Sequence, residues 1–290
     1  MIEGGSQFVV SENLVDQPNN SDERMRQLLW RETSRNEIIS RLNSGESMQQ
    51  IIDLLDKSTK AEAFDINKEK VLVCADGRVE MNDDSQVKFG IAGAGVAFDL
   101  VDPLAYKQFV EFMKKAGITE VWSHDDCGAA QVVHGKGDTG DEKGRDFAER
   151  LANDLVVAAK HIIEEDDSGR TTPEMPIHLH HERMLCLDGT GYLNPQKLGL
   201  PSRFLMSSPS IDGYPEDKIR SELTTLLRDV TINHGFGQNF SVEEPMYIVV
   251  SARDAAQQQR FVALAEEVAS ELGEKLPIKI DSFIYNREKN

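Results

Sequence analysis

The chain has 290 residues, with 32 Lys and Arg against 50 Asp and Glu, so its formal net charge is −18. Hydrophobic residues make up 39% of the sequence, which is enough for a sizeable core and excludes wholesale disorder. No run of about 18 apolar residues is present, which predicts no membrane-spanning segment, and the acidic balance argues against general nucleic-acid binding.

Residues 1–65 are expected to form an N-terminal helical arm. The first residues are polar and lack the basic start and apolar region of a secretory signal, so we expect a cytoplasmic protein. From Ser21 to Leu42 apolar residues recur at helical spacing, and the pattern resumes over 47–57 after Gly45. This apolar stripe must pack either on the domain behind it or on a second copy of the chain.

Residues 66–200 alternate strand and helix patterns, which predicts an α/β fold with a mainly parallel sheet flanked by helices. Runs rich in β-branched residues predict the strands, and amphipathic runs predict the helices. The expected strands span 70–76, 88–98 and 118–126, and 175–194 is expected to contain further strand and turn. The expected helices span 103–116, Cys127 to about His134 and about 145–165, with a charged loop at 135–144.

Residues 201–290 are predicted to form a C-terminal extension packed on this core. A helix is expected near 215–230, followed by a strand–helix–strand unit over 246–252, 253–273 and 277–285. The run YIVVSARD in this extension loosely resembles VLVCADGR, which begins at Val71. Since buried strands resemble one another by composition, we assign no internal repeat on this likeness.

Cysteine and histidine residues follow two of the core strands. Cys74, Asp76 and Arg78 come at the end of the first strand, and His124 and Cys127 come at the end of a later one. The carboxyl ends of parallel strands meet at one crevice, so these groups should converge. Two thiolates and an imidazole suit Zn²⁺, and three protein ligands leave one position open, as in catalytic zinc sites.

Asp76 and Arg78 follow Cys74 at intervals of two. In an extended segment their side chains point the same way, and Arg78 can hold Asp76 ionised through a charge-assisted pair. Asp76 could then accept a hydrogen bond from a zinc-bound hydroxide, or it could bind the metal as the fourth ligand. The sequence leaves both roles open.

The pattern C-x-D-x-R followed by H-x-x-C-G resembles that of the β-class carbonic anhydrases, and the likeness covers about residues 70–195. The resemblance implies that Cys74, His124 and Cys127 bind Zn²⁺ and that Asp76 and Arg78 form a catalytic dyad. It implies reversible hydration of carbon dioxide to bicarbonate and a proton by zinc-bound hydroxide. It further implies a homodimer or higher homo-oligomer, with the N-terminal helices around the partner.

Two departures from the family pattern affect the expected pocket wall. A Gly-rich segment, 90–95, replaces a more polar one, and Ser123 stands where Gly is common. The altered wall keeps a zinc hydrolase of carbonyl sulfide or carbon disulfide as one alternative. The long C-terminal extension keeps a catalytically silent zinc-binding interaction protein as the other. Segment 90–95 does not match the dinucleotide fingerprint, so we expect close backbone packing beside the metal site.

The remaining histidines and cysteine receive structural interpretations. His134 could shuttle protons, but we expect a solvated side chain. His178, His180 and His181 would need further ligands to form a second metal site. Cys186 alternates within an apolar strand and is expected to be buried.

Overall fold

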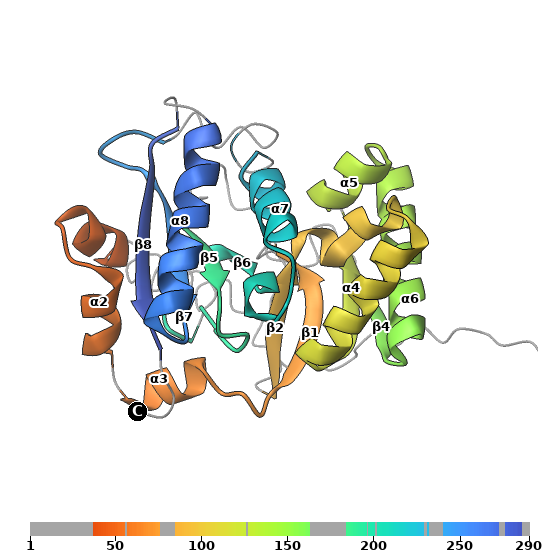
Figure 1. Cartoon of the computed structure of the whole chain (residues 1–290), viewed down its shortest axis with the longest axis horizontal. Helices are drawn as coiled ribbons and strands as arrows, with labels where there is room; N and C mark the ends of the chain where they lie inside the picture. Colours follow the sequence, from red (N-terminus) through yellow and green to blue (C-terminus); the bar gives the residue numbers. More distant parts are fainter. Residues whose placement is uncertain are drawn as a thin grey trace, which may run out of the picture.

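The computed structural model of the protein describes residues 37–55, 57–75, 85–125, 127–162, 184–195, 197–200, 202–228, 231, 240–272 and 276–285. These residues form two four-stranded parallel sheets flanked by helices (Figure 1). The expected α/β class with mainly parallel strands is therefore confirmed.

The first sheet has the strand order β2-β1-β3-β4, and all its strands are parallel. Its central residues are almost entirely apolar, and Val71, Leu72 and Val73 are fully buried. Such continuous apolar runs are typical of parallel strands that are covered on both faces. The strands are β1 (Glu69–Cys74), β2 (Gln86–Ile91), β3 (Ile118–His124) and β4 (Ala158–Ile162).

Four helical segments accompany this sheet: the 3₁₀ segment η2 (Ala92–Asp99), α4 (Pro103–Ala116), α5 (Gly128–His134) and α6 (Asp138–Leu155). Helix α4 matches the predicted helix. Its N-cap Asp102 accepts hydrogen bonds from the backbone N–H groups of Leu104 and Ala105. Gly117 ends the helix in a left-handed conformation, with φ of 75°.

The predicted helix at 145–165 is wrong at both ends. Helix α6 begins inside the expected charged loop, where Asp138 and Asp141 lie in its first turn and suit the positive end of the helix dipole. It ends at Leu155, and the next residues pair with β3 as strand β4. A short apolar run fits a helix and a strand equally well, so its periodicity does not decide between them. Here pairing with β3 makes the run a strand.

The predicted strand at 88–98 is also shorter than expected. Strand β2 ends at Ile91, because Gly93, Ala94 and Gly95 have positive φ angles and turn the chain into η2.

The second sheet has the strand order β6-β5-β7-β8, again with all strands parallel. Strand β5 lies in the part of the sequence assigned to the 66–200 core, but it pairs with β6 and β7 of the C-terminal part. The C-terminal helices and the strand–helix–strand unit match the prediction. The elements are β5 (Met184–Asp188), β6 (Ser202–Met206), η4 (Ser208–Ser210), α7 (Glu216–Arg228), β7 (Met246–Ala252), α8 (Ala255–Glu271) and β8 (Ile278–Ile284).

The two sheets have the same topology. In each, the first strand along the chain lies between the second and the third, and the fourth strand follows the third. In this strand order β7, which carries YIVVSA, corresponds to β3. The run VLVC lies on β1, which corresponds to β5, so the two similar runs do not hold equivalent positions. The fold therefore repeats where the sequence likeness did not reveal it.

The sheets meet where β2 and β6 cross. The backbone N–H of Leu205 donates to the carbonyl of Ala75 at 3.0 Å, and that of Ser207 donates to the carbonyl of Gly90 at 2.8 Å. A Cβ atom on Gly90 would stand 1.8 Å from the carbonyl oxygen of Leu205, so only glycine allows this approach. One hydrophobic cluster runs through both sheets and joins them into one core.

The described part of the N-terminal arm packs on the second sheet. It comprises helical residues 37–43, α2 (Met48–Leu54) and α3 (Lys57–Ala63), and Figure 1 shows α2 beside β8. Its buried apolar residues join a cluster with residues of β5, β7 and β8. Phe64 stacks on Tyr285, with ring centroids 3.6 Å apart. This part of the apolar stripe is therefore covered within the chain.

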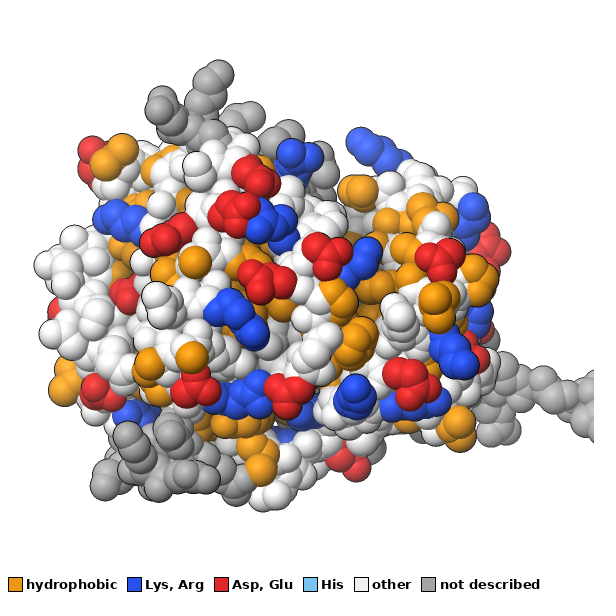
Figure 2. Space-filling view, in the orientation of Figure 1, with side chains coloured by type: hydrophobic (Ala, Val, Ile, Leu, Met, Phe, Trp, Pro, Cys, Tyr) orange, Lys and Arg blue, Asp and Glu red, His pale blue; other side chains and the backbone are white. Residues whose placement is uncertain are grey.

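Acidic and basic side chains are interspersed on the face shown in Figure 2. Arg220 of α7 pairs with Glu267 and Glu271 of α8. Within the described ranges, no helix has both the length and the hydrophobicity to cross a membrane.

Candidate metal centre

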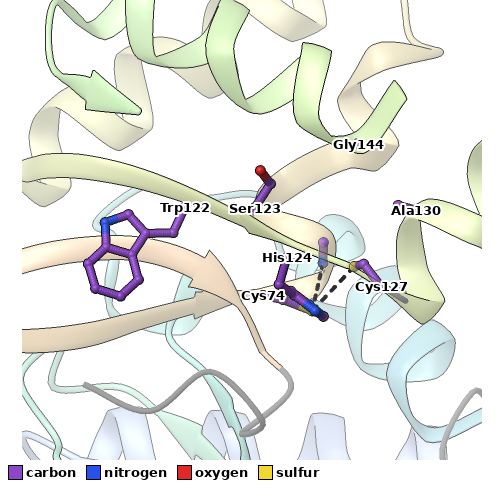
Figure 3. A pocket seen from close by; sticks show the side chains of 8 residues that line it. Cys74, Trp122, Ser123, His124, Cys127, Ala130 and Gly144 are labelled. Atoms are coloured by element: carbon purple, nitrogen blue, oxygen red, sulfur yellow. Dashed lines mark hydrogen bonds between the residues drawn. The ribbon is translucent and has the colours of Figure 1, made fainter. Parts of the chain in front are cut away.

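Three potential metal ligands converge at the carboxyl ends of two adjacent strands of the first sheet. Cys74 is the last residue of β1, His124 is the last residue of β3, and Cys127 is the N-cap of α5. Their ligand atoms all lie within 4.8 Å of one another. The Sγ atoms of Cys74 and Cys127 are 3.8 Å apart (Figure 3). The convergence predicted from the sequence is therefore present in the fold.

The cluster is shielded from solvent, since each of the three residues is only 5% exposed. Gly93 supplies a backbone contact, because its N–H donates a hydrogen bond to Cys74 Sγ at 3.3 Å. The positive φ of Gly93, 55°, turns the chain at this point. The expected close packing of the Gly-rich segment beside the site is confirmed here, and a hydrogen-bond donor favours the thiolate form that binds metals.

A hydrogen bond fixes the tautomer of His124. Its Nδ1 lies 2.8 Å from the backbone carbonyl oxygen of Asp125, and a carbonyl can only accept, so Nδ1 carries the proton. The lone pair of the neutral ring is then on Nε2. A backbone carbonyl, like a carboxylate or a water molecule, is a common partner of the second ring nitrogen in metal-binding histidines.

The donor set fits a metal ion. Two buried sulfurs and one imidazole nitrogen within 4.8 Å of one another are the kinds of atom that bind thiophilic divalent metals. Among the described residues, the cluster Cys74–His124–Cys127 is the group of Cys, His and carboxylate side chains that meets this geometry.

A small pocket adjoins the cluster, with an empty volume of about 230 Å³ that includes its open side. Part of its wall is formed by Ala130 and Gly144, which lie close together, because a Cβ atom on Gly144 would stand 3.0 Å from Cβ of Ala130. The lining residues are Cys74, Gly93, Trp122, Ser123, His124, Cys127, Ala130 and Gly144.

Several residues considered from the sequence lie outside the described residues. These are the expected dyad Asp76 and Arg78, and the histidines His178, His180 and His181.

His134 and Cys186 have defined surroundings. The side chain of His134 is only 4% exposed and its Nε2 lies 3.2 Å from a carboxylate oxygen of Asp99, so the expected solvated histidine is wrong. Arg150 binds the other oxygen of Asp99 and thereby completes a charged cluster around the end of α5. Cys186 is fully buried in the core of the second sheet, as expected.

The second sheet lacks the equivalent ligands at the same topological positions. Strand β7 ends in Ala252 where β3 ends in His124. Asp188, at the end of β5, accepts hydrogen bonds from the backbone and hydroxyl of Thr190 and from the hydroxyl of Ser251. A carboxylate satisfied in this way holds the turn after β5, which is a structural role.

Sequence reasoning missed a hydrogen-bonded set beside the metal cluster. Ser123 Oγ lies 2.8 Å from His161 Nδ1, and His161 Nε2 lies 2.7 Å from Asp125 Oδ1. The sequence marks Ser123 only as a departure from the family pattern, and it predicts a helix around His161. The signal that was available is the apolar and β-branched run around His161, which forms β4.

A scan against protein-family models finds no matching family, and searches of the curated proteins and of the solved structures find no match either.

Proposed function

We propose that this protein is a zinc-dependent carbonic anhydrase that hydrates carbon dioxide reversibly to bicarbonate and a proton. The observation that carries the proposal is the buried cluster of two sulfurs and one imidazole nitrogen, with all ligand atoms within 4.8 Å of one another. Zn²⁺ is the metal that this donor set suits, and three protein ligands leave a position for water or substrate.

Cys74, His124 and Cys127 would hold the metal, which when bound supplies the Lewis acidity that makes water nucleophilic at neutral pH. The chain's own residues prepare this site. The N–H of Gly93 stabilises the thiolate of Cys74, and the carbonyl of Asp125 orients the ring of His124. Arg78 and Asp76 are proposed to act as the catalytic dyad, in which Arg78 keeps the carboxylate of Asp76 ionised.

The pocket supports a small neutral substrate. Apart from the three metal ligands, its lining consists of Gly93, Trp122, Ser123, Ala130 and Gly144, and none of these five carries a formal charge. Carbon dioxide is neutral and linear and needs no charged side chain to enter. Carbonyl sulfide and carbon disulfide share this shape, so the altered Gly-rich wall keeps their hydrolysis as the second candidate.

The test is zinc content together with carbon dioxide hydration, followed by stopped flow with a pH indicator. We expect about one zinc per chain and measurable hydration in the wild type. Asp76→Ala should keep zinc and lose most of the rate, by about 10²-fold or more, if the carboxylate acts as proposed. Cys74→Ser should lose zinc affinity.

Cys186→Ser is the matched control for the cysteine variant, because Cys186 is buried and lies in the second sheet away from the cluster. It should retain zinc at wild-type stoichiometry in the folded fraction. A zinc-loaded wild type that hydrates no carbon dioxide overturns the proposal. Turnover of carbonyl sulfide alone supports the second candidate, and the absence of any turnover supports a silent zinc-binding protein.

We further propose a homodimer, which is expected from the family resemblance. The described arm residues, which begin at residue 37, pack on the second sheet of the same chain, as the Phe64–Tyr285 stack illustrates. Light scattering of the zinc-loaded protein tests the proposal, and the molar mass of a single 32.4 kDa chain would contradict it.

A further inference from the structure

A chain of hydrogen bonds leads away from the wall of the metal pocket. Ser123 lines the pocket, and its hydroxyl oxygen lies 2.8 Å from Nδ1 of His161. His161 Nε2 lies 2.7 Å from Asp125 Oδ1. The parallel pairing of β3 with β4 places Ser123 directly opposite His161, so the sheet itself holds the first contact.

The side chains of His161 and Asp125 differ in their access to solvent. The side chain of His161 is 9% exposed, whereas that of Asp125 is 31% exposed. The backbone N–H of Asp125 donates to the carbonyl of Ile162 at 3.1 Å, which fixes the loop after β3 against β4. The hydrogen bonds therefore run from the pocket wall, through a nearly buried imidazole, to a carboxylate that water can reach.

The partners determine the direction of each hydrogen bond. An ionised carboxylate only accepts, so the neutral ring of His161 carries its proton on Nε2 and donates it to Asp125. Nδ1 then holds the lone pair, and the hydroxyl of Ser123 donates to it. In this arrangement His161 can receive a proton only from the side of the pocket.

The charged neighbour of His161 on β4 does not compete for the ring. Lys160 pairs with Glu120 at 2.9 Å and lies over the ring of Trp122. Consecutive strand residues point to opposite faces of a sheet, so this pair occupies the other face. Asp125 is the carboxylate whose contact with the ring is established.

We propose that Ser123 and His161 form the proton exit of the metal pocket, with Asp125 as the positioning residue that sets the tautomer of His161. This rests on the proposed function, because each hydration of carbon dioxide releases one proton. A water molecule in the pocket gives a proton to Ser123 Oγ while Ser123 gives its own hydroxyl proton to His161 Nδ1, and the hydroxide ion left behind serves the next hydration. His161 becomes a cation that the carboxylate of Asp125 balances. The imidazolium ring then turns toward solvent, a buffer base removes the proton from Nδ1, and the neutral ring returns with its proton on Nε2.

The kinetic test uses the full-length, zinc-loaded protein at low and high buffer concentration. Proton exit follows the hydration step, so its loss lowers kcat and leaves kcat/KM unchanged. We expect His161→Ala and Ser123→Ala to lower kcat at low buffer by about tenfold or more. Added imidazole should restore kcat in His161→Ala. A purely structural role would instead lower kcat/KM or zinc content, without rescue.

His134→Gln is the matched control, because His134 is likewise a buried histidine beside a carboxylate but lies outside the relay. It should keep the wild-type kcat at both buffer concentrations. Unchanged kcat at low buffer in His161→Ala overturns the relay while the carbonic anhydrase proposal stands. An inactive wild type overturns the proposed function, and nitrogen NMR of the histidine rings then decides whether the relay is present.

Nitrogen NMR of the histidine rings tests the relay without any turnover. We expect neutral His161 to carry its proton on Nε2, and we expect its Nδ1 resonance to shift in Ser123→Ala because the hydroxyl donor is gone. A proton on Nδ1, or no shift in Ser123→Ala, overturns the proposal. Covalent labelling of Ser123 by a fluorophosphonate would also overturn it, since the set would then activate a nucleophile rather than export protons.

Discussion

Gly90 of β2 lies against the backbone carbonyl of Leu205 in β6, and a Cβ atom on Gly90 would stand 1.8 Å from that oxygen. This contact joins the two sheets, because the neighbouring Ser207 N–H donates to the carbonyl of Gly90 itself. The backbone N–H of Leu205 also donates to the carbonyl of Ala75, the residue after Cys74. The contact between the sheets therefore also holds the end of β1, where the first metal ligand lies.

Gly90→Ala should therefore destabilise the whole protein. The added methyl group must push β2 and β6 apart, and overpacking of this kind costs about 1–3 kcal/mol or more. Urea unfolding of the wild type and the variants measures the free energy of unfolding. Gly213→Ala is the control: its added Cβ atom meets no atom within 4 Å, so its cost is only the backbone strain of an alanine at positive φ. A loss in Gly90→Ala no larger than in the control would contradict the tight crossing.

The spacing of Cys74 and Cys127 predicts a redox difference between the metal-free and metal-loaded protein. Their sulfurs are 3.8 Å apart and both residues are 5% exposed, so a mild oxidant needs to draw the sulfurs together by less than about 2 Å to form a disulfide. Bound metal should protect both thiolates. Oxidation followed by denaturation and thiol counting should leave one thiol, that of Cys186, in the chelator-treated protein. All three should remain in the zinc-loaded protein, and equal counts in both forms would refute the prediction.

The carboxyl group of Glu222 should make the free energy of unfolding depend on pH. Burial raises the pKa of this carboxyl to about 7, although the hydroxyls of Ser208 and Tyr214 donate to it. The folded state therefore holds a proton that the unfolded chain releases near its ordinary pKa of 4.5. Stability should fall as the pH rises from about 4.5 to about 7, by roughly 3 kcal/mol.

Glu222→Gln should remove this part of the pH dependence, because the amide stays neutral. Urea unfolding of both proteins across this pH range, in the same metal state, measures the effect. Glu266→Gln is the control, since Glu266 is exposed on α8 and should keep the wild-type slope. If Glu222→Gln and the wild type lose stability in parallel, Glu222 is not the group responsible.

Phe64 tests how strongly the N-terminal arm is held. Its ring is 2% exposed, stacks on Tyr285 and meets Tyr192 and Phe283 edge to face. Phe64→Ala should cost about 3–5 kcal/mol of unfolding free energy. Leu54→Ala, on the same arm but 70% exposed, should cost far less. A comparable small loss in both variants would show that the arm contributes little.

The sequence by itself determined the strands and helices whose periodicity and end signals agree. Helix α4 has an Asp N-cap and a Gly at its end, and β7, α8 and β8 follow one another with clear patterns. It also determined the convergence of Cys74, His124 and Cys127, because the carboxyl ends of neighbouring parallel strands meet at one edge.

Only the tertiary structure decided what depends on pairing between distant segments. The run around His161 is short and apolar, and pairing with β3 makes it strand β4, which brings His161 beside Ser123. The repeated strand order of the two sheets and the burial of the arm on the second sheet likewise depend on register and packing. Such contacts are settled by the free energy of the whole core, which local sequence patterns do not contain.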